Sequence, residues 1–295
     1  MIRLPPPSFT YENALDTCLE GITGNPELRR KLSKGKDELV TAGTNYANRA
    51  NLGTLYEIAA APENRDNEPF VDELTPNELI TVYEQYLVGA QKPGRRLYDE
   101  IKSLAKDKCP FCGINSIGNV DHFLPKKHFP QFSVYPQNLV PACRDCNMGA
   151  KGQSYATSAD EQVIHPFSDH SRFFETQWIS AEYHPEQGPH HPGWTEFSAT
   201  PPDDWSPNDA AKVKKHFEDF GLAKMYGIQA AEQLIVVLLQ VRSAGTFEMA
   251  RRIIFQPVID SPLHPNHWKR VMYQALLQHF ERLQEEARTL ERSCG

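Results

Sequence analysis

The segments CPFCG (residues 109–113), NVDHFLP (119–125) and NLVPACRDCNMGAKG (138–152) follow one another in the middle of the chain and decide its fold. The first and the last of these segments each contain a Cys-x-x-Cys pair. Four thiolates at this spacing form the closed, tetrahedral site of a structural zinc ion. The sequence therefore predicts one zinc ion that braces the stretch through Cys109, Cys112, Cys143 and Cys146.

The residues between and after the cysteine pairs predict two short strands followed by a helix. NVDHFLP has the pattern of a short strand, and NLVPACRDCNMGAKG has that of a strand which runs into a helix. A Pro- and aromatic-rich loop separates the two. This order predicts a compact β-β-α unit at the centre of the chain.

Cysteine usage and the opening residues indicate a reducing compartment. The paired cysteines favour metal over disulfides, and Cys18 and Cys294 stand alone with no role assigned. The opening MIRLPPPSFT lacks the apolar core of a signal peptide, and the longest apolar run, residues 234–239, is too short to cross a bilayer. We therefore expect a cytoplasmic protein with no membrane partner.

The flanks of the central unit have mainly helical patterns. Apolar residues recur at three- and four-residue spacing in residues 27–40, 75–88, 94–107, 209–245 and 264–293. The aromatic segments 172–184 and 193–199 predict a small strand pair. We expect an α+β fold, mainly α-helical, with an N-terminal helical region 1–94, a zinc-braced domain 95–170 and a mostly helical region 171–295 with a small β element.

Charge is unevenly distributed along the sequence. The formal net charge is −7, which argues against a protein that grips nucleic acid through its overall charge. Residues 95–151, however, carry nine Lys and Arg against five Asp and Glu. This pattern indicates a basic working surface in an acidic frame, or ordinary surface scatter. No phosphate-binding G-x-x-x-x-G-K-[ST] motif occurs, so we expect no ATP hydrolysis by this chain.

The pair Asp121-His122 supplies residue types that phosphodiester hydrolysis needs. A neutral His accepts a proton from water, and an Asp offers a hard oxygen ligand to Mg²⁺. Both residues lie on the first predicted strand, where neighbouring side chains point to opposite faces. They serve one site only if the strand twists or bulges there, or if they reach a substrate phosphate from two sides.

The full set of residues resembles the HNH family of endonucleases, whose core is a ββα-metal unit. The resemblance rests on the pair DH at 121–122, NL at 138–139, the string C-x-x-C-N at 143–147, and Lys151. It implies that His122 is the general base and that Asn138 braces the loop and orients His122. It also implies that Asp121 and Asn147 hold a catalytic divalent ion, and that the four cysteines are the zinc ligands which many members carry.

Two further expectations follow from that resemblance. The family's third letter is often His, whereas this chain has Asn147, and an amide oxygen favours Mg²⁺ or Mn²⁺ over zinc or nickel at the catalytic position. Four basic side chains near the unit are expected to contact phosphates, although solvated surface charge is an equal reading for the lysine pair. These residues are Arg144, Lys151, Lys126 and Lys127.

The string DHFLPKKHFPQFSVYPQNLVPACRDCN is similar to one branch of HNH proteins, the nuclease subunits of Septu-type and related retron anti-phage systems. The resemblance implies a companion ATPase as partner. We expect nucleic acid as substrate, with DNA favoured over RNA. Two alternative functions stay open. In the first, the chain is a catalytically idle zinc module that binds nucleic acid or protein. In the second, it is a subunit whose helices chiefly assemble a larger complex.

Overall fold

The computed structural model describes residues 1–185, 193–281 and 283–284, with the backbone alone for residues 149–151. Cys294 therefore lies outside the described residues. The chain forms two compact units, Ile2–His170 and Ser171–Gly295 with Met1, called here the N-terminal and C-terminal units. Residues 2–94 and 95–170, expected as separate regions, belong to the same unit. The described residues form helices and two two-stranded sheets, in agreement with the expected class at this coarse level.

The described elements follow the chain in this order. The N-terminal unit contains α1 (Tyr11–Gly21), α2 (Pro26–Leu52), η1 (Leu55–Glu57), α3 (Pro76–Thr81), η2 (Val82–Leu87), α4 (Arg95–Ser103), β1 (Asn119–His122), η3 (Pro130–Phe132), η4 (Pro136–Asn138), β2 (Leu139–Ala142), η5 (Asp145–Lys151) and η6 (Ala159–Glu161). The C-terminal unit contains α5 (Arg172–Glu175), β3 (Ile179–His184), β4 (Trp194–Ala199), α6 (Pro207–Asp219), α7 (Leu222–Ala244), α8 (Phe247–Ala250), η7 (Arg251–Phe255), α9 (Gln256–Ile259) and α10 (Trp268–Gln278).

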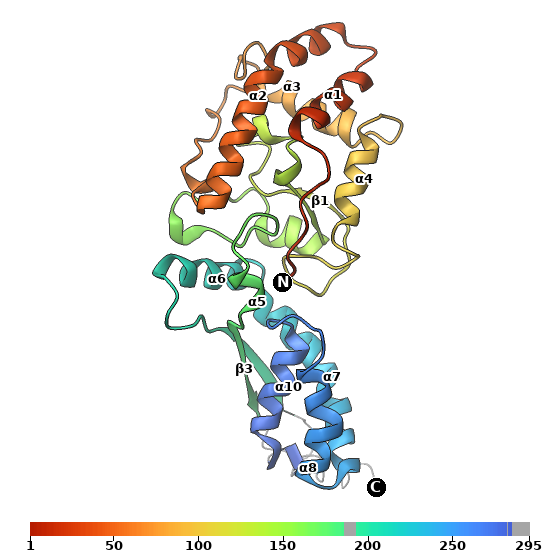
Figure 1. Cartoon of the computed structure of the whole chain (residues 1–295), viewed down its shortest axis with the longest axis vertical. Helices are drawn as coiled ribbons and strands as arrows, with labels where there is room; N and C mark the ends of the chain where they lie inside the picture. Colours follow the sequence, from red (N-terminus) through yellow and green to blue (C-terminus); the bar gives the residue numbers. More distant parts are fainter. Residues whose placement is uncertain (186–192, 282, 285–295) are drawn as a thin grey trace. The chain divides into compact units, whose positions relative to one another are not determined.

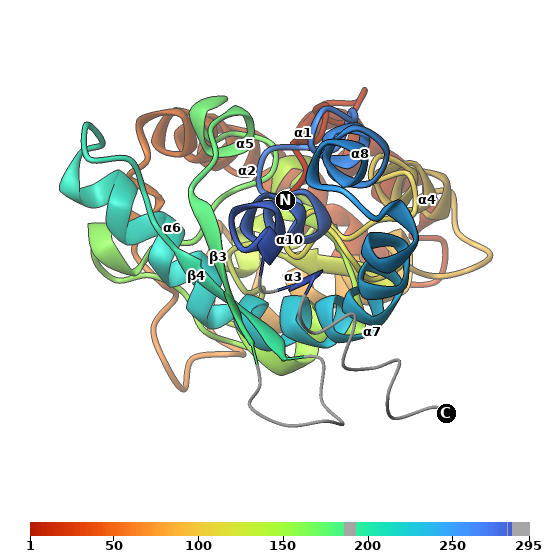
Figure 2. The ribbon, with the colours of Figure 1, turned by 90° about the horizontal axis from the view of Figure 1, so that it is seen from below.

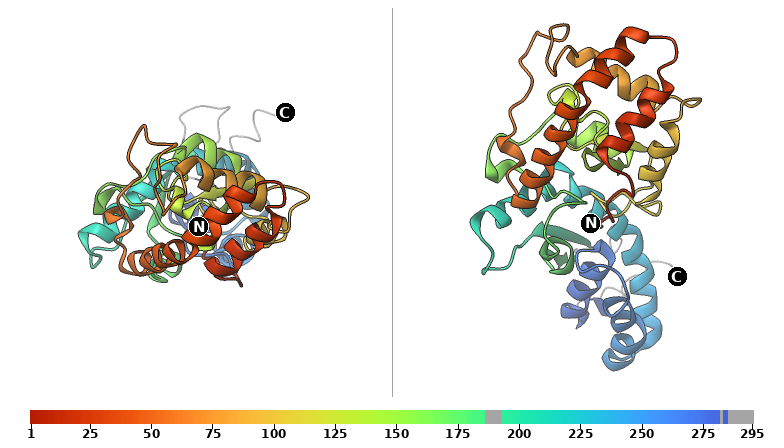
Figure 3. Two further views of the ribbon diagram at one scale, coloured as in Figure 1. Left: turned by 90° about the horizontal axis from the view of Figure 1, so that it is seen from above. Right: turned by 45° about the horizontal axis from the view of Figure 1, so that its top comes forward.

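Helices α1 and α2 lie side by side in the N-terminal unit, as Figures 1 and 3 show. Each begins at a residue that caps it. Thr10 and Asn13 form a capping box at α1, and the Asn25 side chain accepts the Leu28 N–H at the start of α2. Helix α2 ends at Gly53, whose φ of 68° is a left-handed conformation that glycine adopts without strain.

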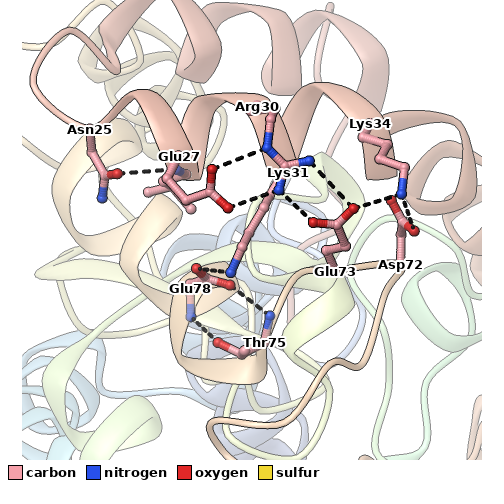
Figure 4. Close-up of polar contacts among 10 residues, drawn as sticks. Asn25, Glu27, Arg30, Lys31, Lys34, Asp72, Glu73, Thr75 and Glu78 are labelled. Carbon is pink, nitrogen blue, oxygen red and sulfur yellow. Dashed lines mark hydrogen bonds and ion pairs between the residues drawn. The ribbon is translucent and has the colours of Figure 1, made fainter.

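Ion pairs join one face of α2 to α3 and to the segment that leads into it (Figure 4). Arg30 and Lys34 both pair with Glu73, and Lys31 donates to Glu78 at 2.9 Å. Single exposed pairs contribute at most about 1 kcal/mol each, but Arg30 and Lys34 share the carboxylate of Glu73. These pairs therefore hold the polar segment before α3 against α2.

The central β-β-helix order expected from the sequence is present. Strands β1 and β2 pair antiparallel, with Asn119 opposite Ala142 and His122 opposite Leu139, and η5 follows β2 as a wide helical turn. The 16 residues between the strands are mostly buried, which is unusual for a connection. The short turns η3 and η4 lie in this connection, and its aromatic side chains pack edge to face against Tyr46 of α2.

In the C-terminal unit, the hairpin β3–β4 packs against α7 and α10 (Figures 1 and 2). The hairpin confirms the expected strand pair, although residues 172–175 form the short helix α5 instead of extended chain. The helical pattern of residues 209–245 forms two helices, because Gly221 takes a left-handed φ of 58° between α6 and α7. A helical periodicity continues across such a break and does not reveal it.

Helix α7 is, within the described part of the chain, the one helix that is long and apolar enough to cross a membrane, with a mean hydropathy of 1.3. This property concerns length and composition alone, and the core helices of globular proteins share it. One face of α7, including Tyr226, Leu234 and Leu238, is buried in this unit, where the helix contacts β4 and α10.

Asn266 anchors the start of the hairpin. Its side-chain oxygen accepts the N–H groups of Trp178 and Ile179 at 2.8 and 3.0 Å, and its amide donates to the Thr176 carbonyl at 2.8 Å. We expect Asn266→Ala to lower the free energy of unfolding by about 2–4 kcal/mol, because two buried N–H groups lose their acceptor. All four tryptophans lie in residues 171–295, so denaturation followed by tryptophan fluorescence reports this unit.

Gln274→Ala is the control for that measurement. Its side chain accepts a hydrogen bond from Gln177 at 2.9 Å in an exposed position, so we expect a change within about 0.5 kcal/mol. Equal effects of the two substitutions would contradict the anchoring role of Asn266.

Candidate metal centre and adjoining pocket

The four paired cysteines meet in one buried cluster of the N-terminal unit. Their sulfur atoms all lie within 4.8 Å of one another, and none of the four forms a disulfide. The sulfurs of Cys112 and Cys143 are 4.0 Å apart, close to the roughly 3.8 Å that tetrahedral zinc with Zn–S bonds of about 2.3 Å requires. The cluster is therefore positioned to bind a metal ion such as zinc.

Local hydrogen bonds shape this centre. The Cys109 N–H donates to the Asn115 carbonyl, and the Gly113 N–H, in a left-handed residue, donates back to the Cys109 carbonyl. The Cys146 N–H and the Asn115 amide both donate to the Cys143 sulfur. Hydrogen bonds from the Cys109 thiol first, and from its other neighbours, lower the pKa of Cys143. These contacts favour a thiolate, the form that binds metal.

A small polar pocket adjoins the hairpin β1–β2. It has a volume of about 180 Å³, and Asp121, His122, Asn147, Lys126 and Tyr83 are among its lining residues. Asp121 and His122 are neighbours on β1, yet both reach this pocket, as they must to serve one site. His122 is the last residue of the strand, where strict alternation of faces ends.

The His122 ring contacts Ser133 and Tyr83. Its Nε2 atom lies 2.9 Å from the Ser133 carbonyl oxygen, and the ring of Tyr83 lies edge to face at 4.4 Å. A carbonyl oxygen only accepts hydrogen bonds, so Nε2 carries the proton and the lone pair of the neutral ring is on Nδ1. The Asp121 carboxylate accepts the His122 backbone N–H at 2.7 Å.

Asn138 lies outside the pocket and is completely buried at the end of the connection between the strands. Its side-chain oxygen accepts the Leu124 N–H at 2.7 Å, and its amide donates to the carbonyls of Leu124 and Phe132 at 3.0 and 3.2 Å. Its own carbonyl accepts the Phe123 N–H. Asn138 thus holds together both ends of the segment that presents Ser133 to His122.

The four basic residues expected at this site occupy different positions. Lys126 lines the pocket, where its ammonium pairs with Glu84 at 2.6 Å and lies 4.9 Å above the Tyr83 ring. Lys127 is exposed, and Arg144 is exposed beside the cysteine cluster. The Lys151 side chain lies outside the described residues, although its backbone closes η5.

Two pocket residues, Tyr83 and Gln153, lie outside the segments that predicted the site. Tyr83 lies in a helical pattern, where an aromatic residue predicts core packing, and it comes from η2, about forty positions before His122. Gln153 directly follows the patterned segment 138–152. Only the contact between the Tyr83 ring and the His122 ring in the folded chain identifies Tyr83 as a neighbour of the histidine.

The described chain is thus a mixed α/β protein with four buried cysteines positioned to bind a metal ion, next to a small pocket lined by Asp, His and Asn. Comparison with known proteins adds its family. The chain is 35% identical to protein ea31 of Escherichia phage lambda over 291 residues, which is 94% of this chain and 97% of that protein. The chain belongs to the ea31 family.

A second relative matches a smaller part of the sequence. Septu protein PtuB of Bacillus thuringiensis is 30% identical over 100 residues, which is 32% of this chain and 38% of that protein. No family model matches the chain, and no solved structure matches it. The resemblance to a Septu protein therefore holds for part of the chain, and the likeness to ea31 extends over nearly all of it.

Replacement of a cluster cysteine tests the metal centre. We expect Cys143→Ser to lose most of the zinc that the purified wild-type protein holds at about one ion per chain, because a thiolate ligand is removed. Elemental analysis of the dialysed protein measures this directly. Cys18→Ser is the control, since Cys18 is buried elsewhere and burial raises its pKa to about 12. Full zinc content in Cys143→Ser would contradict the assignment.

Proposed function

We propose that this protein is a metal-dependent endonuclease of the HNH type that hydrolyses phosphodiester bonds of nucleic acid, DNA rather than RNA. The observation that supports this proposal is the pocket itself. Asp121, His122 and Asn147, selected from the sequence as one constellation, line the same 180 Å³ space together with Lys126. A general base, two oxygen ligands and a cation are the groups that phosphodiester hydrolysis needs.

His122 acts as the general base in this proposal. The hydrogen bond from Nε2 to the Ser133 carbonyl keeps the ring in the tautomer whose Nδ1 accepts a proton. The edge of Tyr83 limits rotation of the ring. As the proton moves from an attacking water to Nδ1, the Ser133 carbonyl stabilises the positive charge that develops on the imidazole.

Asp121 and Asn147 would hold the catalytic cation. Carboxylate and amide oxygens suit Mg²⁺ or Mn²⁺, and such an ion neutralises charge on the phosphate and on the departing 3′ oxygen. Asn147 follows Cys146 directly, so the cysteine cluster fixes where η5 begins. A structural zinc ion would thereby position a ligand of the second metal. The products expected from this chemistry carry a 5′-phosphate and a 3′-hydroxyl.

The comparisons support a role in conflict between phages and bacteria. Part of the chain resembles a Septu protein, and nearly all of it resembles a protein of a phage. We propose that the nuclease acts on the nucleic acid of an infecting phage and that a companion ATPase controls it. A family with a member in a phage genome fits competition between a resident phage and a newcomer.

Removal of the base tests the activity. We expect wild-type protein to cut supercoiled plasmid with Mg²⁺ or Mn²⁺ and not with EDTA, and His122→Ala to cut at least about 100-fold more slowly at unchanged zinc content. His128→Ala is the matched control, because this histidine lies in the same connection and its ring contacts Tyr155 instead of the pocket. Equal rates for wild type and His122→Ala would contradict the proposed base and favour an idle zinc module.

Lys126 provides a test of substrate binding. In the free protein its ammonium is paired with Glu84, and a substrate phosphate competes with that carboxylate. We expect Lys126→Ala to raise KM and to reduce the salt dependence of log Kd by about one unit of slope, whereas Glu84→Gln lowers KM. Lys127→Ala, one position away and exposed, is the control. An unchanged salt slope in Lys126→Ala would show that this lysine binds no phosphate.

A further inference from the structure

Two polar side chains lie buried behind the pocket and are not used by the chemistry proposed above. Tyr46 comes from α2 and His165 from the segment after η6, and both are almost completely buried. The Tyr46 hydroxyl lies 3.2 Å from the Asn138 side-chain oxygen and 3.0 Å from His165 Nε2. A buried polar group destabilises the fold unless its hydrogen bonds are made. The Tyr46 hydroxyl makes its hydrogen bonds to Asn138 and to His165, so His165 reaches Asn138 through Tyr46.

The hydrogen bonds of this group run in one direction. The Phe167 backbone N–H can only donate, and it does so to His165 Nδ1 at 3.2 Å. The proton of the neutral His165 ring is therefore on Nε2, which donates to the Tyr46 oxygen. The Tyr46 hydroxyl in turn donates to Asn138. Burial raises the pKa of Tyr46 well above its usual value, so the hydroxyl keeps the proton that it donates.

The Tyr46 bond completes the hydrogen bonding of the Asn138 amide. The other three bonds of that amide go to Leu124 and Phe132, on either side of the segment between β1 and Ser133. The His165 ring also lies 4.1 Å from the ring of Phe123, the residue after His122. Both contacts act on the segment that presents the Ser133 carbonyl to His122.

We propose that Tyr46 and His165 are positioning residues, which hold the Asn138 amide so that the Ser133 carbonyl keeps His122 in its Nε2–H tautomer. The catalytic consequence rests on the proposed nuclease function. The structural consequence does not, since the tautomer of His122 can be observed without any cutting. A purely structural tyrosine would stabilise the core and leave that tautomer unchanged.

The test is nitrogen NMR of the histidine rings in the zinc-loaded full-length chain. The signals of His122 are assigned by their loss in His122→Gln. We expect wild type to show a single Nε2–H tautomer at His122 and Tyr46→Phe to show a mixture of tautomers. We further expect Tyr46→Phe to lower kcat about 10-fold with KM within about twofold, as loss of a group that orients a functional histidine typically does.

Tyr135→Phe is the matched control. Tyr135 belongs to the same aromatic cluster, with its ring 4.9 Å from that of Tyr46, and its hydroxyl makes a single 3.4 Å hydrogen bond to Gln137. The substitution removes a partly buried hydroxyl and keeps every hydrogen bond of the Asn138 side chain. We expect an unchanged His122 tautomer and an unchanged kcat.

A second variant covers the case in which Tyr46→Phe does not fold. His165→Phe keeps a ring against Phe123 and removes the donor to Tyr46. We expect this variant to show a mixture of His122 tautomers as well, with a smaller change from wild type. In the double variant, the effects of Tyr46→Phe and His165→Phe on the His122 tautomer are not additive, because both substitutions act through Asn138. A single Nε2–H tautomer in a folded Tyr46→Phe or His165→Phe protein would overturn the proposal. If the wild-type protein cuts no nucleic acid but the variants show a mixture of His122 tautomers, the positioning role is upheld and the nuclease function is refuted.

Discussion

The buried amide of Asn138 is the contact on which the geometry of the pocket depends. It is completely buried, and its four hydrogen bonds run to three other residues, one of them on α2. Few residue types fill such a position, because it needs two donors and an acceptor that takes two bonds in a planar arrangement. Any other side chain there leaves buried backbone groups without partners, at about 1–3 kcal/mol each. The connection between the strands is consequently as well ordered by hydrogen bonds as a regular element.

The second constraint is the cysteine cluster, which lies at the end of strand β2 opposite to Asn138. Strand β2 spans only Leu139–Ala142, so Asn138 immediately precedes it and Cys143 immediately follows it. A four-residue strand has little stability of its own, but here both of its ends are fixed by interactions with distant parts of the N-terminal unit. Because β1 pairs with this strand, His122 is placed opposite Leu139. The cysteine cluster and the buried amide together set the distance between the histidine and Asn147.

The two relatives match different lengths of this chain, and only the match with ea31 is long enough to include nearly all of both units. The match with ea31 covers 94% of the chain, so both compact units are part of what the family shares. The match with the Septu protein covers about a third of the chain. The Septu protein therefore shares less than half of its own length with this chain, whereas ea31 shares 97% of its length. The C-terminal unit of this chain contains a hairpin and helices with a well-packed core of their own.

The sequence by itself determined the four cysteines as one centre, the Asp-His pair beside it, the two strands and most helices. These features depend on spacing along the chain, because metal ligands, strand alternation and helical periodicity are local. Only the tertiary structure brought Tyr83 to the His122 ring and Tyr46 to Asn138 and His165, which lie 92 and 119 positions away. An aromatic residue on a helical face has the same local pattern whether it fills a core or supports a functional residue. Which of the two it does depends on the packing of distant segments, and local periodicity carries no information about that packing.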